Sequence, residues 1–294
     1  MNKSFSPYTV AMVTPFEEDG RLGETSVRAL TRYLVETGVP ALLVSGSTGE
    51  QHSMTVEEKA QLYAWTAKAA VPVYAGVAAV RTSDAVRLAQ AAERAGCAGI
   101  MLGFPPYVRL TALDALEYIR RVGAATPLPL LLYNNPLRTA FDLLPETLLQ
   151  AVVEVPTVQA VKEAGDASRA AIYRQSLGDG FQVFSGGDRL IAESWAKGYN
   201  GLTSIAGNLW PREVAAIVEA LASGDRARGE AFLKPLAPLF EAVIEPQLPS
   251  TLKYAMRLRG LPGGWCREPL GHLGTELERR VEAALQKPYL PLDY

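Results

Sequence analysis

The amino-acid sequence predicts an α/β fold: a (β/α)8 TIM barrel with a C-terminal helical extension. Two observations predict it. Short apolar runs alternate with longer segments of helical period, and the apolar runs show no polar alternation. Strands that are apolar throughout are buried on both faces, as in a parallel sheet covered by helices. Eight such strand and helix units suit a barrel, for which about 250 residues is typical.

The eight expected strands are short and apolar, and they span residues 10–14, 41–45, 73–76, 99–102, 130–133, 158–162, 182–185 and 201–204. The amphipathic segments between and after them are expected to be helices, at residues 24–36, 55–69, 82–95, 111–123, 145–153, 166–176, 188–197 and 211–223. Many open with Thr, Ser, Asp or Pro, which are residues that start helices. Several end at a glycine, which stops them.

Beyond these units the pattern changes to helices alone. Three more amphipathic segments follow, at residues 225–243, 249–259 and 273–285. Their apolar residues need a surface to cover, so they should pack on the side of the barrel. We therefore expect a barrel at residues 1–223 and a packed helical extension at residues 224–294.

Composition excludes several classes of function. The chain has 294 residues, of which 48% are hydrophobic, and a formal net charge of -2. Neither sign of charge dominates, so neither a nucleic-acid groove nor a membrane surface is expected as a partner. No apolar run approaches the roughly 18 residues of a membrane span, and the start lacks the apolar core of a signal peptide. Cys97 and Cys266 follow no redox spacing, so we expect reduced thiols in a cytoplasmic protein.

The histidines exclude further chemistry. His52 and His272 are the only two in the chain, so no pair shares a helix face and no Cys/His cluster exists. A metal site is therefore not expected. Each histidine is expected to have a surface or loop role rather than a place in a catalytic triad. Lysine, tyrosine, hydroxyl and carboxylate side chains remain to carry acid-base chemistry.

Lys162 is the candidate nucleophile, because it closes the expected buried strand at residues 158–162. A desolvated lysine amine loses its proton readily and can attack a carbonyl to form a Schiff base. A lysine at this kind of junction is also often only a solvated charge. The neighbouring strand ends favour the chemical role, since in this fold they build the site. Gly186 and Thr203 stand at the ends of the seventh and eighth strands.

Hydroxyl groups gather at the other strand ends. Ser47 and Thr48 follow the second strand, and Tyr133 ends the fifth. They can pass protons while a Schiff base forms, and a nearby cationic lysine tunes the proton affinity of a tyrosine. The turn of residues 46–49, which ends at Gly49, offers free backbone amides to a carboxylate such as that of a 2-oxo acid.

Several short motifs occur in order and at barrel-consistent spacing: Thr14-Pro15-Phe16, Gly46-Ser47-Thr48-Gly49-Glu50, Tyr107, Tyr133-Asn134-Asn135-Pro136, Val161-Lys162-Glu163, Ser185-Gly186-Gly187-Asp188 and Gly201-Leu202-Thr203-Ser204. Each motif alone is weak. Together they cover nearly the whole chain, which resembles the dihydrodipicolinate synthase and N-acetylneuraminate lyase family, the pyruvate-type class I aldolases.

The resemblance implies a role for each candidate. Lys162 would form the Schiff base with pyruvate, so that no cofactor is needed, and Tyr133 would donate and accept protons. Ser47 or Thr48 would link Tyr133 to solvent or hold the pyruvate carboxylate. Tyr107 resembles the tyrosine that such enzymes insert into a neighbouring subunit's site, which implies a homodimer or homotetramer. Otherwise Tyr107 is an aromatic anchor in a proline-rich loop.

The second substrate is less clear. Arg138 stands where the synthases carry an arginine that holds the carboxylate of aspartate semialdehyde, and its planar fork suits that task. Otherwise Arg138 is a surface residue paired with a carboxylate such as Asp142. Ser47 stands where the synthases mostly have threonine. Val80 stands where they mostly have asparagine, which implies that the lysine feedback site of some members is absent.

The expected activity is a pyruvate-dependent carbon-carbon lyase or synthase. The best single reaction is dihydrodipicolinate synthesis from pyruvate and an aldehyde, aspartate semialdehyde. An aldolase, dehydratase or deaminase acting on a 2-oxo sugar acid or a related imino acid through the same lysine remains an alternative. A barrel that binds a small carboxylate as a sensor, without catalysis, is a remote one.

Overall fold

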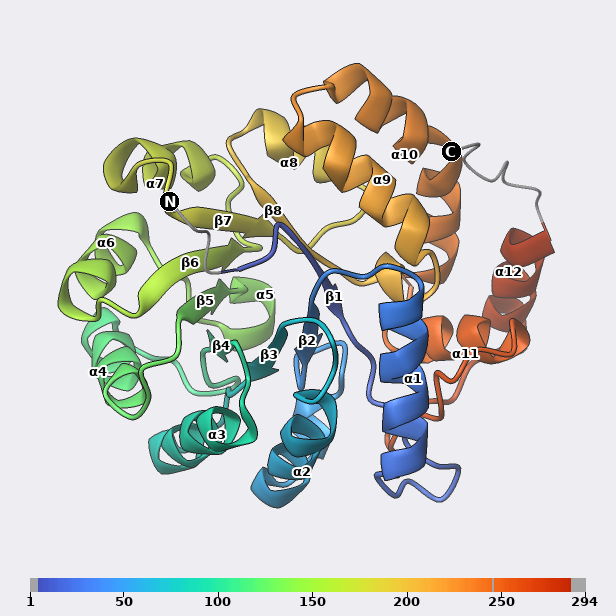
Figure 1. Ribbon diagram of the computed structural model, residues 1–294, viewed down its shortest axis with the longest axis horizontal. Coiled ribbons are helices and arrows are strands. Elements are labelled where there is room, and N and C mark those ends of the chain that lie inside the picture. Colours follow the sequence, from blue (N-terminus) through green and yellow to red (C-terminus); the bar gives the residue numbers. More distant parts are fainter. Residues whose placement is uncertain (1–4, 245, 287–294) are drawn as a thin grey trace.

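Eight parallel strands form a closed barrel in the order β1 to β8, and β1 pairs with β8 to close it. The structure is a computed structural model that describes residues 5–244 and 246–286. Helices surround the barrel in a ring, and further helices lie outside this ring on one side (Figure 1). The predicted TIM barrel with C-terminal helices is confirmed.

The strands lie close to their expected positions: β1 (Tyr8–Ala11), β2 (Leu42–Val44), β3 (Val73–Gly76), β4 (Gly99–Gly103), β5 (Leu130–Asn134), β6 (Val158–Glu163), β7 (Gln182–Ser185) and β8 (Gly201–Ser204). The expected position of the first strand, residues 10–14, was wrong at both ends. The residues from Val10 to Val13 are all buried and apolar, so their sequence does not reveal where β1 stops. Thr14 consequently lies in the loop beyond β1.

The ring helices are α1 (Glu24–Glu36), α2 (Val56–Thr66), α3 (Thr82–Ala95), α4 (Ala112–Gly123), α6 (Pro145–Glu154), α7 (Arg169–Leu177), α8 (Ile191–Ala196) and α9 (Pro211–Ala222). Three one-turn helices were not expected: η1 (Gln51–Ser53), α5 (Pro136–Thr139) and η2 (Ala206–Asn208). Helix α8 begins three residues later than expected. Asp188, the expected first residue, instead accepts hydrogen bonds from the Ser204 hydroxyl and the backbone amides of Ile205 and Ala206.

Apolar side chains fill the barrel interior from its N-terminal end. The inner cluster consists of Phe5, Ala41, Leu43, Tyr74, Met101, Leu131, Ala160 and Phe184. Phe5 is fixed by Gln182 at the start of β7, which accepts from the Phe5 amide at 3.0 Å and donates to its carbonyl at 2.9 Å. This end of the barrel is filled, and the cavity that Lys162 lines lies toward the C-terminal ends of the strands.

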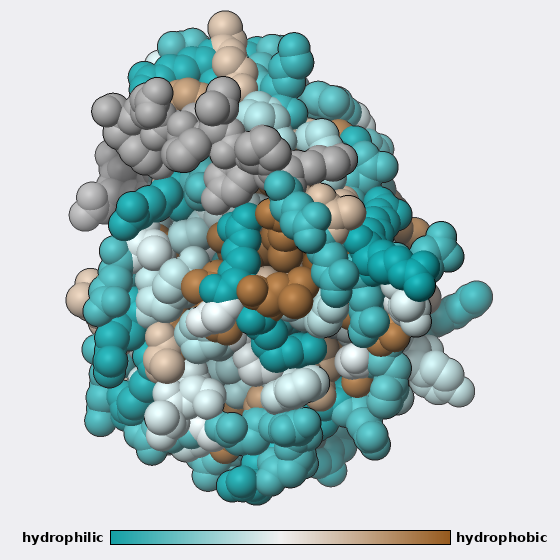
Figure 2. Space-filling view, turned by 90° about the vertical axis from the view of Figure 1, so that its right-hand side faces the viewer, coloured by the Kyte–Doolittle hydropathy of each residue, from teal (hydrophilic) through white to brown (hydrophobic). Residues whose placement is uncertain are grey.

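The C-terminal helices are α10 (Arg226–Val243), α11 (Ser250–Leu258) and α12 (Thr275–Gln286). Helix α10 packs against α8 and α9, and α12 packs against α10 and α11. The side of the molecule that carries these helices is mostly hydrophilic, with apolar side chains gathered in a hollow near its centre (Figure 2). Through its contacts with α8 and α9, helix α10 lies on the ring of helices around the barrel, as expected for a packed extension.

One buried ion pair joins the C-terminal helices to the barrel. Lys253 of α11 and Glu50 after β2 are both fully buried, and Nζ of Lys253 lies 2.5 Å from Oε1 of Glu50. The same ammonium donates to the carbonyl oxygens of Thr14 and Trp265 at 2.5 and 2.6 Å. The backbone amide of Arg267 donates to the other oxygen of Glu50. All three N–H groups of Lys253 are thereby satisfied, so both charges tolerate burial.

We predict that Lys253→Met lowers the free energy of unfolding by about 3–5 kcal/mol, because it leaves the Glu50 carboxylate buried without its cation. Chemical denaturation measures the change. Arg226→Met is the matched control, because its partner Glu230 forms an exposed pair, with side chains 58% and 49% exposed. That control should change stability by less than about 1 kcal/mol. Equal losses in the two variants would contradict the assigned importance of the buried pair.

Candidate active site

Tyr133 and Lys162 are neighbours across two strands. In the parallel ladder of β5 and β6, Tyr133 pairs with Lys162, and the next residues along, Asn134 and Glu163, pair as well. Alternate residues of a strand face opposite sides of the sheet, so Tyr133 and Lys162 share the inner face. Nζ of Lys162 lies 4.6 Å from the centroid of the Tyr133 ring, and Lys162 is 7% exposed. The candidate nucleophile and the candidate proton donor therefore meet inside the barrel.

Tyr133 has a pKa below its ordinary value. Burial raises the pKa of this phenol, but the positive charge of Lys162, a hydrogen bond from Asn135, the charge of Arg138 and a hydrogen bond with Ser47 together lower it further. Nδ2 of Asn135 lies 2.8 Å from the phenol oxygen. Each of these neighbours favours the phenolate, so Tyr133 is suited to release and recover a proton.

The turn after β2 is held against the end of β1. The Thr14 hydroxyl donates to the carbonyl of Gly49 at 2.6 Å, and a Cβ at Gly49 would lie 3.0 Å from the carbonyl oxygen of Met12. Glycine suits this position because a side chain would make a tight contact with the neighbouring backbone. Glu50 then has the left-handed backbone angle φ of 55° and is tied to Lys253. This anchored turn also fixes the positions of the preceding hydroxyl residues, Ser47 and Thr48.

Two adjoining compartments form the cavity at this end of the barrel. The inner one, of about 170 Å³, is lined by Ala11, Leu43, Gly46, Ser47, Thr48, Met101, Tyr133, Asn135, Arg138, Lys162, Ala164, Gly186 and Ile205. The outer one, of about 250 Å³, shares Ser47, Tyr133, Asn135 and Arg138 with it and adds Gln51, His52, Phe104 and Pro106 among others. The inner compartment suits a small 2-oxo acid beside Lys162, and the outer one suits a second small molecule.

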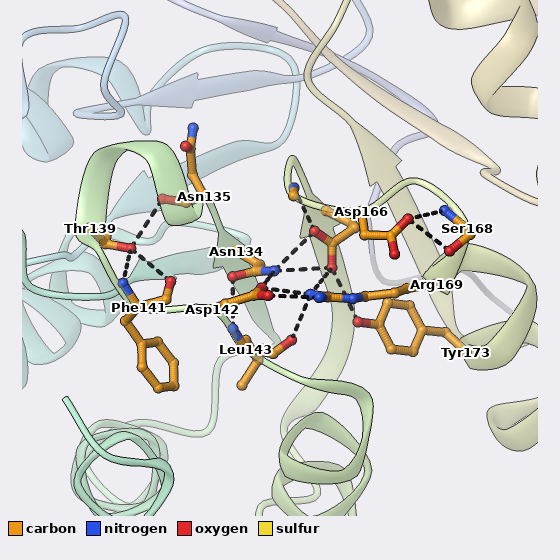
Figure 3. A network of polar contacts seen from close by, with 12 residues as sticks. Asn134, Asn135, Thr139, Phe141, Asp142, Leu143, Asp166, Ser168, Arg169 and Tyr173 are labelled. Atoms are coloured by element: carbon orange, nitrogen blue, oxygen red, sulfur yellow. Dashed lines mark hydrogen bonds and ion pairs between the residues drawn. The ribbon is translucent and has the colours of Figure 1, made fainter. Parts of the chain in front are cut away.

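Outside the barrel wall, a network of buried and partly buried side chains fixes the ends of β5 and β6 (Figure 3). Nδ2 of Asn134 donates to Glu163 at 2.9 Å and to Asp142 at 3.0 Å. The Tyr173 hydroxyl donates to Glu163 at 3.1 Å, and Arg169 binds Asp142 through two 2.6 Å contacts. Burial raises the pKa of Glu163, and the Arg169 guanidinium holds that of Asp142 below its usual range. The inward neighbours Tyr133 and Lys162 are thereby held in register.

Most of the residues predicted from the sequence come together. Six of the nine line the inner compartment: Ser47, Thr48, Tyr133, Arg138, Lys162 and Gly186. Asp142, the alternative partner considered for Arg138, is bound by Arg169 instead. Arg138 itself lines both compartments. Arg138 therefore borders the space that a second substrate would occupy.

The other three predicted residues do not line the inner compartment. Gly49 is buried behind the turn, where its carbonyl accepts the Thr14 hydroxyl. Thr203 is buried on β8, and its hydroxyl has no hydrogen-bond partner in the part of the chain that is described. Tyr107 is 98% exposed and has a left-handed φ of 74°. Tyr107 is therefore not among the residues that line either compartment of this chain.

Sequence reasoning did not assign roles to Asn135, Glu163 or Lys253. Asn135 and Glu163 lie inside motifs that the sequence shows, but a motif does not reveal which groups their side chains contact. Lys253 gave a weak signal, a lysine at a buried position of the amphipathic helix α11. His52 is exposed as expected, yet it lies at the rim of the outer compartment.

Within residues 5–244 and 246–286, no three His, Cys, Asp or Glu side chains are grouped as they would be around a metal ion. Helices in the same part of the chain are too short or too polar to cross a membrane. Cys97 and Cys266 are both free thiols, as expected.

Comparison with known proteins gives one consistent result. The model of the dihydrodipicolinate synthetase family matches residues 4–288. A relative from Moorella thermoacetica, named 4-hydroxy-tetrahydrodipicolinate synthase, is 37% identical over 94% of this chain and 96% of its own. The crystal structure of dihydrodipicolinate synthase from Aquifex aeolicus superposes with a TM-score of 0.92 at 30% identity, covering 96% of this chain and 97% of that one.

A second solved structure, described as a monomeric dihydrodipicolinate synthase variant, has a TM-score of 0.89 and 27% identity over 96% of both chains. The family inferred from the motifs is confirmed, and with it the predicted kind of protein, an enzyme of the lyase and synthase type. This chain belongs to the dihydrodipicolinate synthetase family.

Proposed function

We propose that this protein condenses pyruvate with aspartate semialdehyde through a Schiff base on Lys162, the reaction of a 4-hydroxy-tetrahydrodipicolinate synthase. The observation that carries the proposal is the buried Lys162 amine beside the Tyr133 ring, in a cavity that also contains Arg138. The name shared by several relatives that are 32–37% identical supports the same reaction.

In the first half-reaction, the neutral amine of Lys162 attacks the carbonyl carbon of pyruvate. A proton moves from the attacking nitrogen to the carbonyl oxygen, which gives the carbinolamine. Tyr133 then gives its phenolic proton to the carbinolamine hydroxyl, which leaves as water while the carbon-nitrogen double bond forms. The backbone amides and hydroxyls of Ser47 and Thr48 hold the pyruvate carboxylate. The iminium then accepts the electron pair of the methyl carbon when that carbon loses a proton. The imine itself is the electron sink, so the reaction needs no metal.

In the second half-reaction, the enamine carbon attacks the aldehyde carbon, the iminium re-forms, and the aldehyde oxygen takes a proton from Tyr133. The amino group of the semialdehyde then attacks the iminium carbon and displaces the Lys162 amine, which closes the ring, and the ring nitrogen returns a proton to the Tyr133 phenolate. Arg138 is placed to hold the carboxylate of the incoming aldehyde, because it lines the outer compartment and is not paired with Asp142. The outer compartment of about 250 Å³ suits a short acidic aldehyde better than a long sugar acid. We therefore rank the synthase above the sugar-acid aldolase, dehydratase or deaminase, and all of these above a carboxylate sensor.

The exposure of Tyr107 supports an oligomer. We propose that Tyr107 enters the site of a second copy of this chain in a homodimer or homotetramer. Its side chain is exposed and follows Pro106 of the outer compartment, and it would become buried in such an interface. We also propose a cytoplasmic site of action, which suits the free thiols Cys97 and Cys266.

We predict that incubation with pyruvate and borohydride adds a reduced pyruvyl group to the peptide that contains Lys162. Peptide mass spectrometry locates the adduct. Lys162→Ala should give no adduct, and Lys59→Ala, which removes another poorly exposed lysine, should trap as the wild type does. An adduct that persists in Lys162→Ala would reject the proposed function.

We predict that Gly186→Ala slows this trapping on the order of tenfold or more, because a methyl group there displaces the amine. A Cβ at Gly186 would lie 2.5 Å from Cε of Lys162 and 3.1 Å from its Nζ. Gly187→Ala is the matched control, because its Cβ would meet only the Ser185 hydroxyl, at 3.9 Å. Similar rates in the two variants would show that Lys162 does not react from its observed position.

We predict that Arg138→Lys raises the KM for aspartate semialdehyde by about tenfold or more, because the ammonium keeps the charge but loses the planar fork. The rate of trapping with pyruvate alone should stay near that of the wild type. Steady-state kinetics with each substrate varied in turn separate the two effects. An unchanged KM for the aldehyde would leave Arg138 without a role in the second half-reaction.

A further inference from the structure

Asn135 contacts the catalytic phenol directly, although no motif assigned it a role. It follows β5, and its amide nitrogen lies 2.8 Å from the oxygen of Tyr133. The neighbouring Asn134 side chain turns the other way, into the network with Glu163, and Figure 3 shows the Asn135 side chain pointing away from that network. The two consecutive asparagines therefore serve different sides of the barrel wall.

The backbone of Asn135 is held firmly. Its carbonyl accepts hydrogen bonds from the amides of Arg138 and Thr139 at 3.0 and 3.1 Å and from the Thr139 hydroxyl at 3.0 Å. Pro136 follows and starts α5. A side chain attached to such a turn keeps its direction, so the amide is presented to Tyr133 before any substrate enters.

The polar groups around the phenol differ in whether they can donate or accept hydrogen bonds. The phenol oxygen carries one proton and accepts through its lone pairs, whereas an amide N–H only donates. While they are charged, the two cations near Tyr133, Lys162 of β6 and Arg138 of α5, also only donate. In this charge state, the Ser47 hydroxyl of the β2 turn is the polar neighbour acting on Tyr133 that can accept its proton. His52 lies farther out, on the wall of the outer compartment.

We propose that Asn135 is a positioning residue that sets the direction of proton transfer, because its amide N–H occupies one lone pair of the Tyr133 oxygen. The phenolic proton then points to Ser47 or to a substrate oxygen in the inner compartment. This inference rests on the proposed role of Tyr133 in Schiff-base formation.

The consequence concerns the dehydration step. When the carbinolamine loses water, its carbon-oxygen bond breaks, the nitrogen lone pair forms the imine bond, and the phenolic proton completes the water molecule. Tyr133 is left as a phenolate, whose charge the amide N–H of Asn135 stabilises. The phenolate later takes the proton that leaves the methyl carbon, which restores the phenol and gives the enamine on Lys162.

The test measures the pKa of Tyr133 in the substrate-free protein, with tyrosine labelled by carbon-13 at Cζ and Tyr133→Phe to assign the signal. Asn135→Leu should raise this pKa by about one unit, because the phenolate loses a donor. Asn135→Asp has the same shape but offers only acceptors near neutral pH, so it should raise the pKa further. The exposed Leu137 provides the control Leu137→Ala, which should leave the pKa unchanged.

The same variants are then compared in the pyruvate trapping reaction. Asn135→Leu and Asn135→Asp should trap more slowly, by about tenfold or more, with little change in the pyruvate concentration that gives half the maximal rate. A pKa of Tyr133 that stays within about 0.2 units of the wild type in both variants would overturn the inference. If the wild type itself traps no pyruvate, the proposed function fails, but the pKa comparison still decides whether Asn135 donates to Tyr133.

Discussion

The parallel pairing of β5 with β6 is the constraint on which the site depends. It places Tyr133 opposite Lys162 on the inner face and Asn134 opposite Glu163 on the outer face. The outer pair is bonded to its surroundings by a buried network, and the inner pair is left to face the cavity. A shift of one residue would exchange the two faces, so the same hydrogen bonds that stabilise the barrel also define the chemistry.

Other parts of the molecule help to position the inner pair, Tyr133 and Lys162. The turn after β2 brings Ser47 to the phenol. The buried ion pair between Glu50 and Lys253 links that turn to helix α11. At the end of β7, Gly186 leaves room for the lysine side chain. The C-terminal helices, which carry no residue of the cavity wall among those described, therefore still act on the site through Lys253.

Much of the architecture was readable from the sequence, because it rests on local patterns. Residues 24–36 and 82–95 have the expected helix bounds, since a clear apolar period ends there at polar or glycine signals. Lys162 and Tyr133 were found because a barrel gathers strand ends, whichever residues they carry. The division of the chain at residue 223 remains a prediction.

Features that depend on contacts between distant segments could not be predicted from the sequence. The partner of Lys253 lies 203 residues away along the chain. The end of β1 is set by pairing with β2 and β8 within one long apolar run, so no residue type marks it. Asn135 and Asn134 are identical in type and adjacent in sequence, and only the alternation of the strand and the turn of α5 sends one to the phenol and the other to Glu163.

A crystal structure of the protein grown with pyruvate would show directly whether Lys162 forms the Schiff base. We expect electron density that continues from Nζ of Lys162 into the ligand, with the ligand carboxylate at Ser47 and Thr48 and the phenol oxygen of Tyr133 within hydrogen-bond distance of the former carbonyl position. Pyruvate bound without a covalent link to Lys162, or linked to another lysine, would contradict this mechanism.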